Sequence, residues 1–372
     1  MQRLECHVKN YNWGKKGNKS EVARLFAAGH KNFVMDENET YAELWMGTHP
    51  DGPAVLSNSA TRLSSFIAKS HSASYLSNNN WKEDIHLPFI MKVILQVHPT
   101  KVISSSPSDK AHESEQAARL HEKDPVHYPD RHHKPELAYA LTQFELLCGF
   151  RPADQILKNI EGEEMMEKTR THPDMVSDYV DELVEFRGCL TDSTVKVIQK
   201  MAIDFPGDVG VFSPLILNHI ILKPGECCYY AAEELHAYLS GECVECVGCS
   251  NNTIRAAMTP KFIDREALCE VLNYRMTPPE DYLVTATALT EYPGVDEYSP
   301  NCKDFQLHRI RVSPDFSDSL LPVLDCASIM VIVEGSGVLE EVNTPSSSRL
   351  TVISFGIGFL HSHALLLHHF RF

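Results

Sequence analysis

Residues 224–261 constrain the fold most, because apolar and polar residues alternate through them after a Pro-Gly turn. Side chains two apart on a strand face the same side of a sheet, so this period predicts β-strands rather than helices. We predict strands at 220–222 and 227–230 that form a β-hairpin around the turn, followed by another strand at 236–239. The chain is therefore expected to be rich in β-structure around this stretch.

His236 opens the last of these strands, but a single histidine is more often a hydrogen-bonded core or surface residue than a metal ligand. Gln96 and His98 would share one face of an upstream strand, and Glu136 supplies a carboxylate close to Lys134. Imidazole nitrogens with carboxylate or amide oxygens suit a borderline divalent ion, most often zinc. Ligands so far apart have no signature as specific as paired Cys-x-x-Cys motifs, so spacing alone leaves the question open.

The charge of the chain restricts its partners. A formal charge of -16 at pH 7 argues against nucleic acid or an anionic membrane as a general partner. A phosphorylated substrate would then need a local cationic pocket. No stretch reaches the ~18 apolar residues of a membrane span, and the N-terminus lacks the apolar core of a signal peptide. We expect a cytoplasmic protein whose 372 residues form two or three domains.

The chain contains 11 cysteines, but without a secretion signal they favour thiols over a disulfide scaffold. Cys243, Cys246 and Cys249 recur at every third residue, a spacing that also fits a zinc or iron–sulfur site. Because the segment alternates like a strand, we expect these side chains to pack in the core.

Two regions have the period of helices. A helix near residues 20–28 should begin at Ser20, whose side chain can cap it. Within residues 153–205, apolar residues recur at helical spacing in two groups, and Thr191 is placed to cap the second. This region is therefore predicted to be a small helical insertion, with its methionines in a core rather than at a cofactor.

Strands are predicted again near the C-terminus, at 305–312, 323–333 and 350–355. Residues 361–372 contain several histidines that could in principle bind metal. We expect a disordered or poorly packed tail there.

Several longer motifs follow one another along roughly the first three-quarters of the chain. They are Tyr11-Asn-Trp-Gly14, Tyr41-Ala-Glu-Leu-Trp-Met-Gly-Thr-His49, Leu87-Pro-Phe-Ile-Met-Lys-Val93, Gln96-Val-His-Pro99, Tyr128-Pro-Asp130, His133-Lys-Pro-Glu136, Phe144-Glu-Leu-Leu-Cys-Gly-Phe-Arg-Pro152, His236-Ala-Tyr238 and Asn252-Thr-Ile-Arg-Ala-Ala-Met-Thr-Pro-Lys261. In this order they resemble the type I mannose-6-phosphate isomerases, or phosphomannose isomerases, which are zinc enzymes of the cupin superfamily.

The resemblance implies a mainly β fold of cupin, or jelly-roll, β-barrels with a small inserted helical domain. The implied domains are a discontinuous catalytic cupin domain of residues 1–152 and 206–277, a helical insertion of residues 153–205, and a C-terminal jelly-roll-like domain of residues 278–372.

The resemblance also implies one zinc ion per chain and assigns its ligands by matching motifs. The ligands would be Gln96, His98, Glu136 and His236. The family's active-site arginine matches Arg255.

Further roles follow from the reaction that the resemblance implies. Lys92 and Lys261 are candidates for binding the phosphate, while Lys134 and Glu245 are candidates for moving the proton. The reaction would interconvert mannose 6-phosphate and fructose 6-phosphate through an enediol or enediolate, and would supply mannose 6-phosphate for GDP-mannose synthesis and glycosylation. A small sugar phosphate is the expected partner, and the protein is expected to be a monomer.

The chain departs from the family at several positions. It has Ile94 where relatives have a serine, Asn251 where they often have an aspartate, and a longer, serine-rich segment at 103–115. Isoleucine cannot donate a hydrogen bond, and an amide cannot act as a base. Two alternatives therefore remain: a catalytically impaired cupin that binds sugar phosphate and retains zinc, or an iron-dependent oxygenase.

Overall fold

The computed structural model describes residues 2–30, 32–69, 89–95, 103–105, 114–160, 172–188, 190–302, 304–312, 328–334, 343–344, 347–348 and 363–370. By its internal contacts the chain divides into two compact units. The first comprises Met1–Leu95, Val244–Cys249 and Val284–Phe372, and the second comprises Gln96–Cys243 and Ser250–Leu283. The domain boundaries inferred from the family resemblance stay a prediction.

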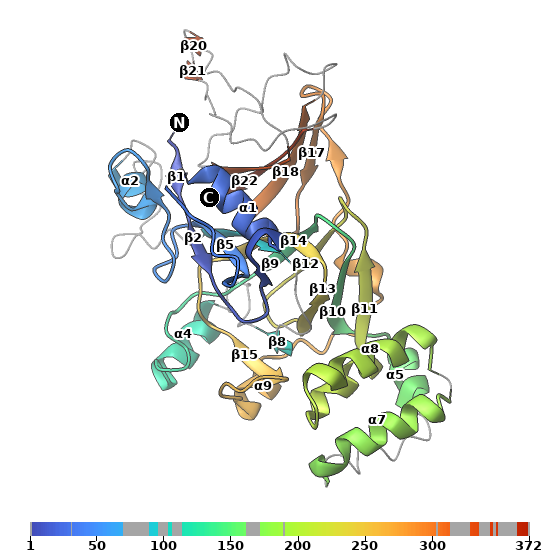
Figure 1. Cartoon of the computed structure of the whole chain (residues 1–372). Coiled ribbons are helices and arrows are strands. Elements are labelled where there is room, and N and C mark those ends of the chain that lie inside the picture. The colour runs from blue at the N-terminus through green and yellow to red at the C-terminus, as the bar shows by residue number, and fades with distance from the viewer. Residues whose placement is uncertain are drawn as a thin grey trace. The chain divides into compact units, whose positions relative to one another are not determined.

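An antiparallel sheet forms the centre of the second unit (Figure 1). Its order is β11 (Leu217–Leu222), β10 (Phe144–Phe150), β13 (His236–Ser240), β8 (Ile103–Ser105) and β15 (Ile254–Ala257). Outside this sheet, β9 (Glu136–Ala140) pairs antiparallel with β12 (Cys227–Tyr230).

The three strands predicted around the Pro-Gly turn are all present, as β11, β12 and β13. The predicted hairpin is wrong, however, because β11 pairs with β10 whereas β12 pairs with β9. Gly225 lies in the turn at a φ of 90°, where a residue without a side chain is favoured. The turn carries the chain from one ladder to another rather than folding it back on itself.

The remaining elements of the second unit are mostly helical. They are α4 (Ser114–Lys123), α5 (Ala153–Ile160), η2 (Pro173–Met175), α7 (Val176–Glu185), α8 (Asp192–Asp204), η3 (Val209–Leu215), α9 (Arg265–Val271) and η4 (Pro279–Tyr282).

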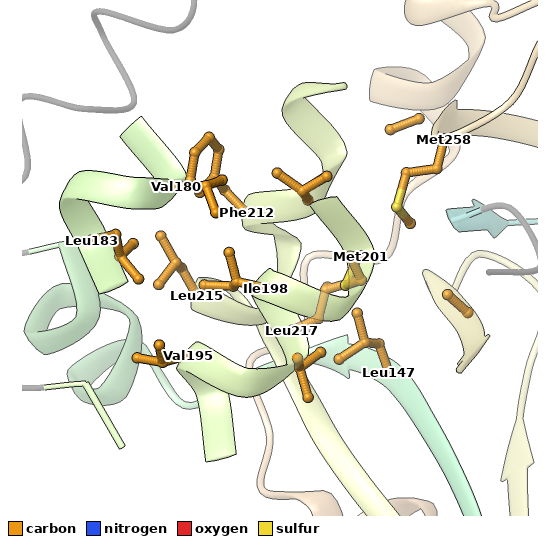
Figure 2. Packing of buried hydrophobic residues seen from close by; sticks show 14 of the residues in the cluster. Leu147, Val180, Leu183, Val195, Ile198, Met201, Phe212, Leu215, Leu217 and Met258 are labelled. Carbon is orange, nitrogen blue, oxygen red and sulfur yellow. The ribbon is translucent and has the colours of Figure 1, made fainter. Parts of the chain in front are cut away.

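Helices α7 and α8 confirm the helical period read from the sequence. The Thr191 side chain caps α8 as predicted, because it accepts a hydrogen bond from the backbone N–H of Thr194. The buried faces of both helices share one core with the sheet, through Leu147 of β10 and Leu217 of β11 (Figure 2). Each such side chain contributes about 1.5 to 3 kcal/mol by its burial. The helices therefore depend on the sheet for their stability.

The first unit is built from two groups of antiparallel strands. One contains β2 (His7–Lys9), β5 (Glu43–Gly47) and β7 (Phe89–Leu95), which pair in that order. The other has the order β16 (Thr287–Ala288), β17 (Val295–Tyr298), β18 (Phe305–Val312), β22 (His363–Phe370) and β19 (Ser328–Glu334).

Short elements complete this unit: β1 (Leu4–Glu5) with β6 (Val55–Leu56), β3 (Lys15–Lys16) with β4 (Thr40–Tyr41), β20 (Asn343–Thr344) with β21 (Ser347–Ser348), and helices η1 (Gly17–Lys19), α1 (Glu21–Gly29) and α2 (Leu63–Lys69). Strand β14 (Glu242–Gly248) has its first two residues in the second unit and the rest in this one. The predicted cap of α1 is confirmed, because the Ser20 hydroxyl accepts from the backbone N–H of Ala23.

The C-terminal predictions have mixed outcomes. The strand predicted at 305–312 is β18, and part of the one at 323–333 is β19, whereas 350–355 lies outside the described residues. The expectation of a disordered tail is wrong for His363–Phe370, which forms β22 between β18 and β19. Its central residues, Ala364 to Leu367, are apolar, so they favour a place inside a sheet.

The described structure is mostly sheet with some helices, as predicted, and its described strands form no closed barrel. Residues 243–249 belong largely to β14, in which Cys243 and Cys246 are buried, consistent with core packing. Among the described residues, no helix has the length and apolar character needed to cross a membrane.

The Glu145 carboxylate of β10 connects α8 to the sheet. This carboxylate accepts hydrogen bonds from Lys200 Nζ at 2.8 Å and Ser240 Oγ at 2.9 Å, and lies 2.9 Å from His219 Nε2. The His219 contact, joined by Lys200 and Ser240, lowers the pKa of Glu145 from 4.5 to about 2, although burial opposes the shift. The folded state therefore prefers the ionised carboxylate.

We predict that Glu145→Gln removes a pH-dependent part of the free energy of unfolding. Because the folded state lowers this pKa, the contribution is fully present above about pH 4.5 and is lost as pH falls toward 2. Urea unfolding at pH 6 and pH 3 should show the variant well below the parent at pH 6 and closer to it at pH 3. The exposed Glu185 provides a control, as Glu185→Gln. A gap that stays constant across this range would contradict the assignment.

Candidate functional site

Glu136 and His236 meet in the second unit. Glu136 begins β9 and His236 begins β13, and both residues are buried. The Glu136 carboxylate Oε2 lies 3.6 Å from His236 Nε2. Two ligand atoms bound to one zinc ion at about 2.1 Å would lie about 3 to 3.4 Å apart, so only a small movement would let these two share an ion.

The His236 ring is oriented by its neighbours. Its Nδ1 lies 3.0 Å from the backbone oxygen of Glu234, a contact that requires the proton on Nδ1. Nε2 then presents its lone pair toward Glu136, which is the tautomer that a metal ligand needs. Tyr230, the register partner of Glu136 in β12, stacks on the imidazole with ring centroids 4.2 Å apart. The ring is therefore held on both its edge and its face.

Lys134 lies beside the same carboxylate. Its Nζ is 2.8 Å from Glu136 Oε1, and both side chains are largely buried. An ion pair with this geometry offsets the desolvation of the carboxylate. In this pairing Lys134 is a charged donor, suited to donating a proton or a hydrogen bond to a substrate oxygen.

Arg255 shares a face of the sheet with His236. His236 in β13 and Arg255 in β15 both pair with Ser104 of β8. Residues in one row of an antiparallel sheet point to the same face, and two strand spacings separate them by about 10 Å. Arg255 therefore lies on the same face of the sheet as His236, with the Ser104 position between them.

The Arg255 guanidinium has few described partners. Its Nη1 donates to the backbone oxygen of Thr253 at 3.4 Å, while its Nε is buried without a hydrogen-bond partner. Burial lowers the pKa of Arg255, and the nearby Tyr128 phenol opposes the shift. An arginine stays charged at neutral pH in any protein. Arg255 is thus a fixed positive charge with donor capacity left for an anionic ligand.

Tyr128 links this arginine to helix α9. Its hydroxyl donates to Asp264 Oδ2 at 3.1 Å, and the other oxygen of Asp264 caps α9. Burial and the Asp264 charge raise the pKa of Tyr128, so the phenol stays neutral. The hydrogen bond between Tyr128 and Asp264 therefore ties the segment beside Arg255 to α9.

A polar clamp joins the loop before Glu136 to the segment before Arg255. Asn252 is fully buried, and its Nδ2 donates to the backbone oxygens of Asp130 at 2.7 Å and His132 at 3.0 Å, and to Asp130 Oδ1 at 3.2 Å. Ser250 Oγ donates to Asp130 Oδ1 at 2.8 Å. The polar clamp, defined as Asp130, Ser250 and Asn252, therefore couples the position of Lys134 and Glu136 to that of Arg255.

Four other predicted site residues lie outside the described part of the second unit, and a fifth is exposed. Gln96 and His98 lie outside the described residues, between β7 and β8 in the sequence. Lys92, in β7, and the buried Glu245, in β14, belong to the other compact unit. Lys261 is exposed in the loop after β15. Their roles stay predictions.

Within the described ranges, no group of three or more histidine, cysteine, aspartate or glutamate residues could hold a metal ion. The Glu136–His236 pair would need further ligands. The four-ligand set stays a prediction, because two of its members, Gln96 and His98, lie outside the described residues.

Sequence analysis missed the polar clamp and the role of Asp264. Tyr128 and Asp130 stand in a motif that resembles the family, but their contacts with residues 250–264 join segments far apart in the chain. A buried asparagine cannot be recognised from a single sequence, because its partners are set by tertiary structure. The Tyr-Pro-Asp motif was the available signal.

Three comparisons with known proteins agree. The family profile described as phosphomannose isomerase type I, catalytic domain, matches residues 1–153. The chain is 35% identical to the mannose-6-phosphate isomerase of Homo sapiens over 92% of this chain and 89% of that protein. It is 32% identical to that of Schizosaccharomyces pombe over 91% and 90%.

Solved structures show the same fold. A mutant of phosphomannose isomerase from Salmonella typhimurium aligns with a TM-score of 0.76 at 24% identity, covering 100% of this chain and 99% of that one. A mannose 6-phosphate isomerase bound with zinc and yttrium aligns with a TM-score of 0.73 at 23% identity, over 100% and 99%.

We predict that Asn252→Ala lowers the free energy of unfolding by about 1 to 3 kcal/mol, because the Asp130 backbone oxygen loses the donor that this buried amide supplies, while the Ser250 hydroxyl still donates to the His132 oxygen. Urea denaturation would measure the loss. Asn251→Ala is a matched control, since Asn251 is exposed and contacts Asp130 through its backbone N–H. Equal stability of the two variants, within about 0.5 kcal/mol, would show that the polar clamp contributes little.

Proposed function

This chain belongs to the mannose-6-phosphate isomerase family, and we propose that it interconverts mannose 6-phosphate and fructose 6-phosphate with one catalytic zinc ion per chain. The approach of Glu136 to His236, with Lys134 paired to the same carboxylate, is the observation that carries the proposal. The reaction would supply mannose 6-phosphate for GDP-mannose synthesis and glycosylation in the cytoplasm.

The described ligands fit a zinc site in chemistry and orientation. His236 presents Nε2, and Glu136 presents a carboxylate oxygen that is already close to it. Gln96 and His98 would complete the set from the segment between β7 and β8. A bound zinc with an open position would orient and polarise the oxygens of the sugar. A solved relative in fold was bound with zinc and yttrium, which supports this choice of metal.

The protein's own residues would handle charge and protons. Moving a proton between C1 and C2 requires stabilisation of an enediolate, whose negative charge Arg255 would face. Lys134 would donate a proton or a hydrogen bond to a sugar oxygen, and Glu245 would act as the carboxylate base. Lys92 and Lys261 would bind the phosphate, which needs local positive charge in a chain with a formal charge of -16.

The proposal includes the finer architecture that the family resemblance implies. The described sheets would belong to cupin barrels, and α5, α7 and α8 would form the inserted helical domain. We expect a monomer, since the proposed ligands all come from one chain.

A second candidate is a zinc-retaining protein that binds sugar phosphate without converting it. Two positions favour it: Ile94 and Asn251 stand where relatives have a serine and often an aspartate. Isoleucine cannot donate a hydrogen bond and an amide cannot act as a base, so turnover could be lost while the zinc ligands are kept.

Metal analysis and an isomerase assay on one sample separate these functions. We expect one zinc per chain in the Glu136–His236 site and turnover of mannose 6-phosphate to fructose 6-phosphate. His236→Ala should abolish turnover and the zinc bound there, whereas His127→Ala, at an exposed histidine of the same unit, should preserve both. Zinc without turnover would favour the second candidate, and iron with oxygen uptake would favour an oxygenase.

We predict that Arg255→Ala retains zinc but lowers kcat by roughly 100- to 1,000-fold, the usual cost of losing one group that stabilises an oxyanion. Steady-state kinetics assign its role. A fall in kcat at unchanged KM indicates stabilisation of the enediolate, whereas a rise in KM at unchanged kcat indicates phosphate binding. Arg255→Lys, which keeps the charge, should recover part of the loss. A near-normal kcat and KM in Arg255→Ala would refute any catalytic role.

A further inference from the structure

A second Gln-x-His motif lies in the first unit. Gln306-Leu307-His308 repeats the pattern of Gln96-Val97-His98, and it lies on strand β18 of the C-terminal sheet. Gln306 and His308 are two residues apart, so they share a face of the sheet. On the neighbouring strand β17, Glu297 is the register partner of His308. Gln306, His308 and Glu297 form a cluster, called here the β18 cluster.

Three side-chain atoms of the β18 cluster lie at almost equal distances from one another. His308 Nε2 is 3.1 Å from Glu297 Oε2 and 2.9 Å from Gln306 Nε2. Gln306 Nε2 is 3.2 Å from the same Glu297 oxygen. Ligand atoms that share a zinc ion at about 2.1 Å lie about 3 to 3.4 Å apart. With the Gln306 amide turned so that its oxygen takes the place of its nitrogen, this triangle has the size of one face of a metal site.

Hydrogen bonds alone satisfy only two of the three contacts. If the Gln306 amide donates to both partners, the His308 and Glu297 lone pairs face each other. If His308 Nε2–H donates to Glu297 and to the glutamine oxygen, then the two oxygens face each other. The nitrogen and oxygen of a glutamine amide are interchangeable in orientation, so either arrangement can be drawn. A cation at the centre would satisfy all three ligand atoms at once.

The surroundings suit a bound cation. His308 is fully buried and Gln306 is 6% exposed, whereas the Glu297 side chain is 26% exposed. Two ligands are thus fixed by packing, and the third lies toward solvent, where ions can enter. The adjacent Asp296 alternates to the other face, where it pairs with Arg309 and Arg311.

We propose that the β18 cluster binds a divalent transition-metal cation, with zinc the best match to an imidazole nitrogen, a carboxylate oxygen and an amide oxygen. The ion would tie β17 to β18 far from the catalytic residues in sequence. It would leave coordination positions for water, and its role would be structural.

Zinc binding to tag-free, full-length protein in the His236→Ala background tests the site, because that substitution removes the proposed catalytic ion. We expect this variant to retain one zinc per chain after dialysis against zinc-containing buffer, and His236→Ala/Glu297→Gln to retain none. Co²⁺ added to the first variant should give a ligand-field absorption band that the second lacks. Glu291→Gln, at an exposed carboxylate of the same unit, is the matched control and should retain the ion.

The outcomes separate the two proposed metal sites. No zinc in His236→Ala, with one zinc in the parent protein, would overturn the β18 site and leave the catalytic site intact. One zinc in the parent that Glu297→Gln removes and His236→Ala does not would support the β18 site and contradict the catalytic zinc. Retention of zinc in the double variant would also overturn the proposal. His308→Leu gives a second test, and circular dichroism would establish that each variant is folded.

Discussion

The contact between Glu136 and His236 is the interaction on which the site depends. These residues begin strands that belong to different ladders, β9 with β12 and β13 with β10. Tyr230 connects the two, because it is the register partner of Glu136 and stacks on His236. A buried carboxylate beside an imidazole is costly unless a cation or proton compensates it, and Lys134 supplies part of that compensation. The geometry therefore points to a site built for positive charge.

The polar clamp extends this arrangement to Arg255. Asn252 and Ser250 place their donors on Asp130 and on the backbone of His132, so the two segments that carry charged groups cannot shift independently. Buried polar networks of this kind fix one register, because every alternative leaves a donor or acceptor unpaired. Such fixed positions are what electrostatic stabilisation of a short-lived anion requires.

Local patterns in the sequence predicted the elements well, and pairing between elements less well. Ser20 and Thr191 were identifiable as helix caps because a cap acts within three residues. The hairpin prediction failed because alternation specifies a strand but not its neighbour, and here the turn passes between ladders. Likewise, the apolar run before His368 was predicted to belong to a disordered or poorly packed tail. It forms a strand between β18 and β19, and such a place depends on partners that are distant in sequence. Glu136 and His236 were found through motifs, whereas Asn252 required the fold.

The most direct test of this account is anomalous diffraction at the zinc absorption edge from crystals of the zinc-loaded protein. The account predicts a peak about 2.1 Å from both Glu136 and His236, with Gln96 and His98 completing the coordination. A peak at that place without Gln96 and His98 would contradict the four-ligand site. Absence of any peak between Glu136 and His236 would contradict the central claim that they share one metal ion.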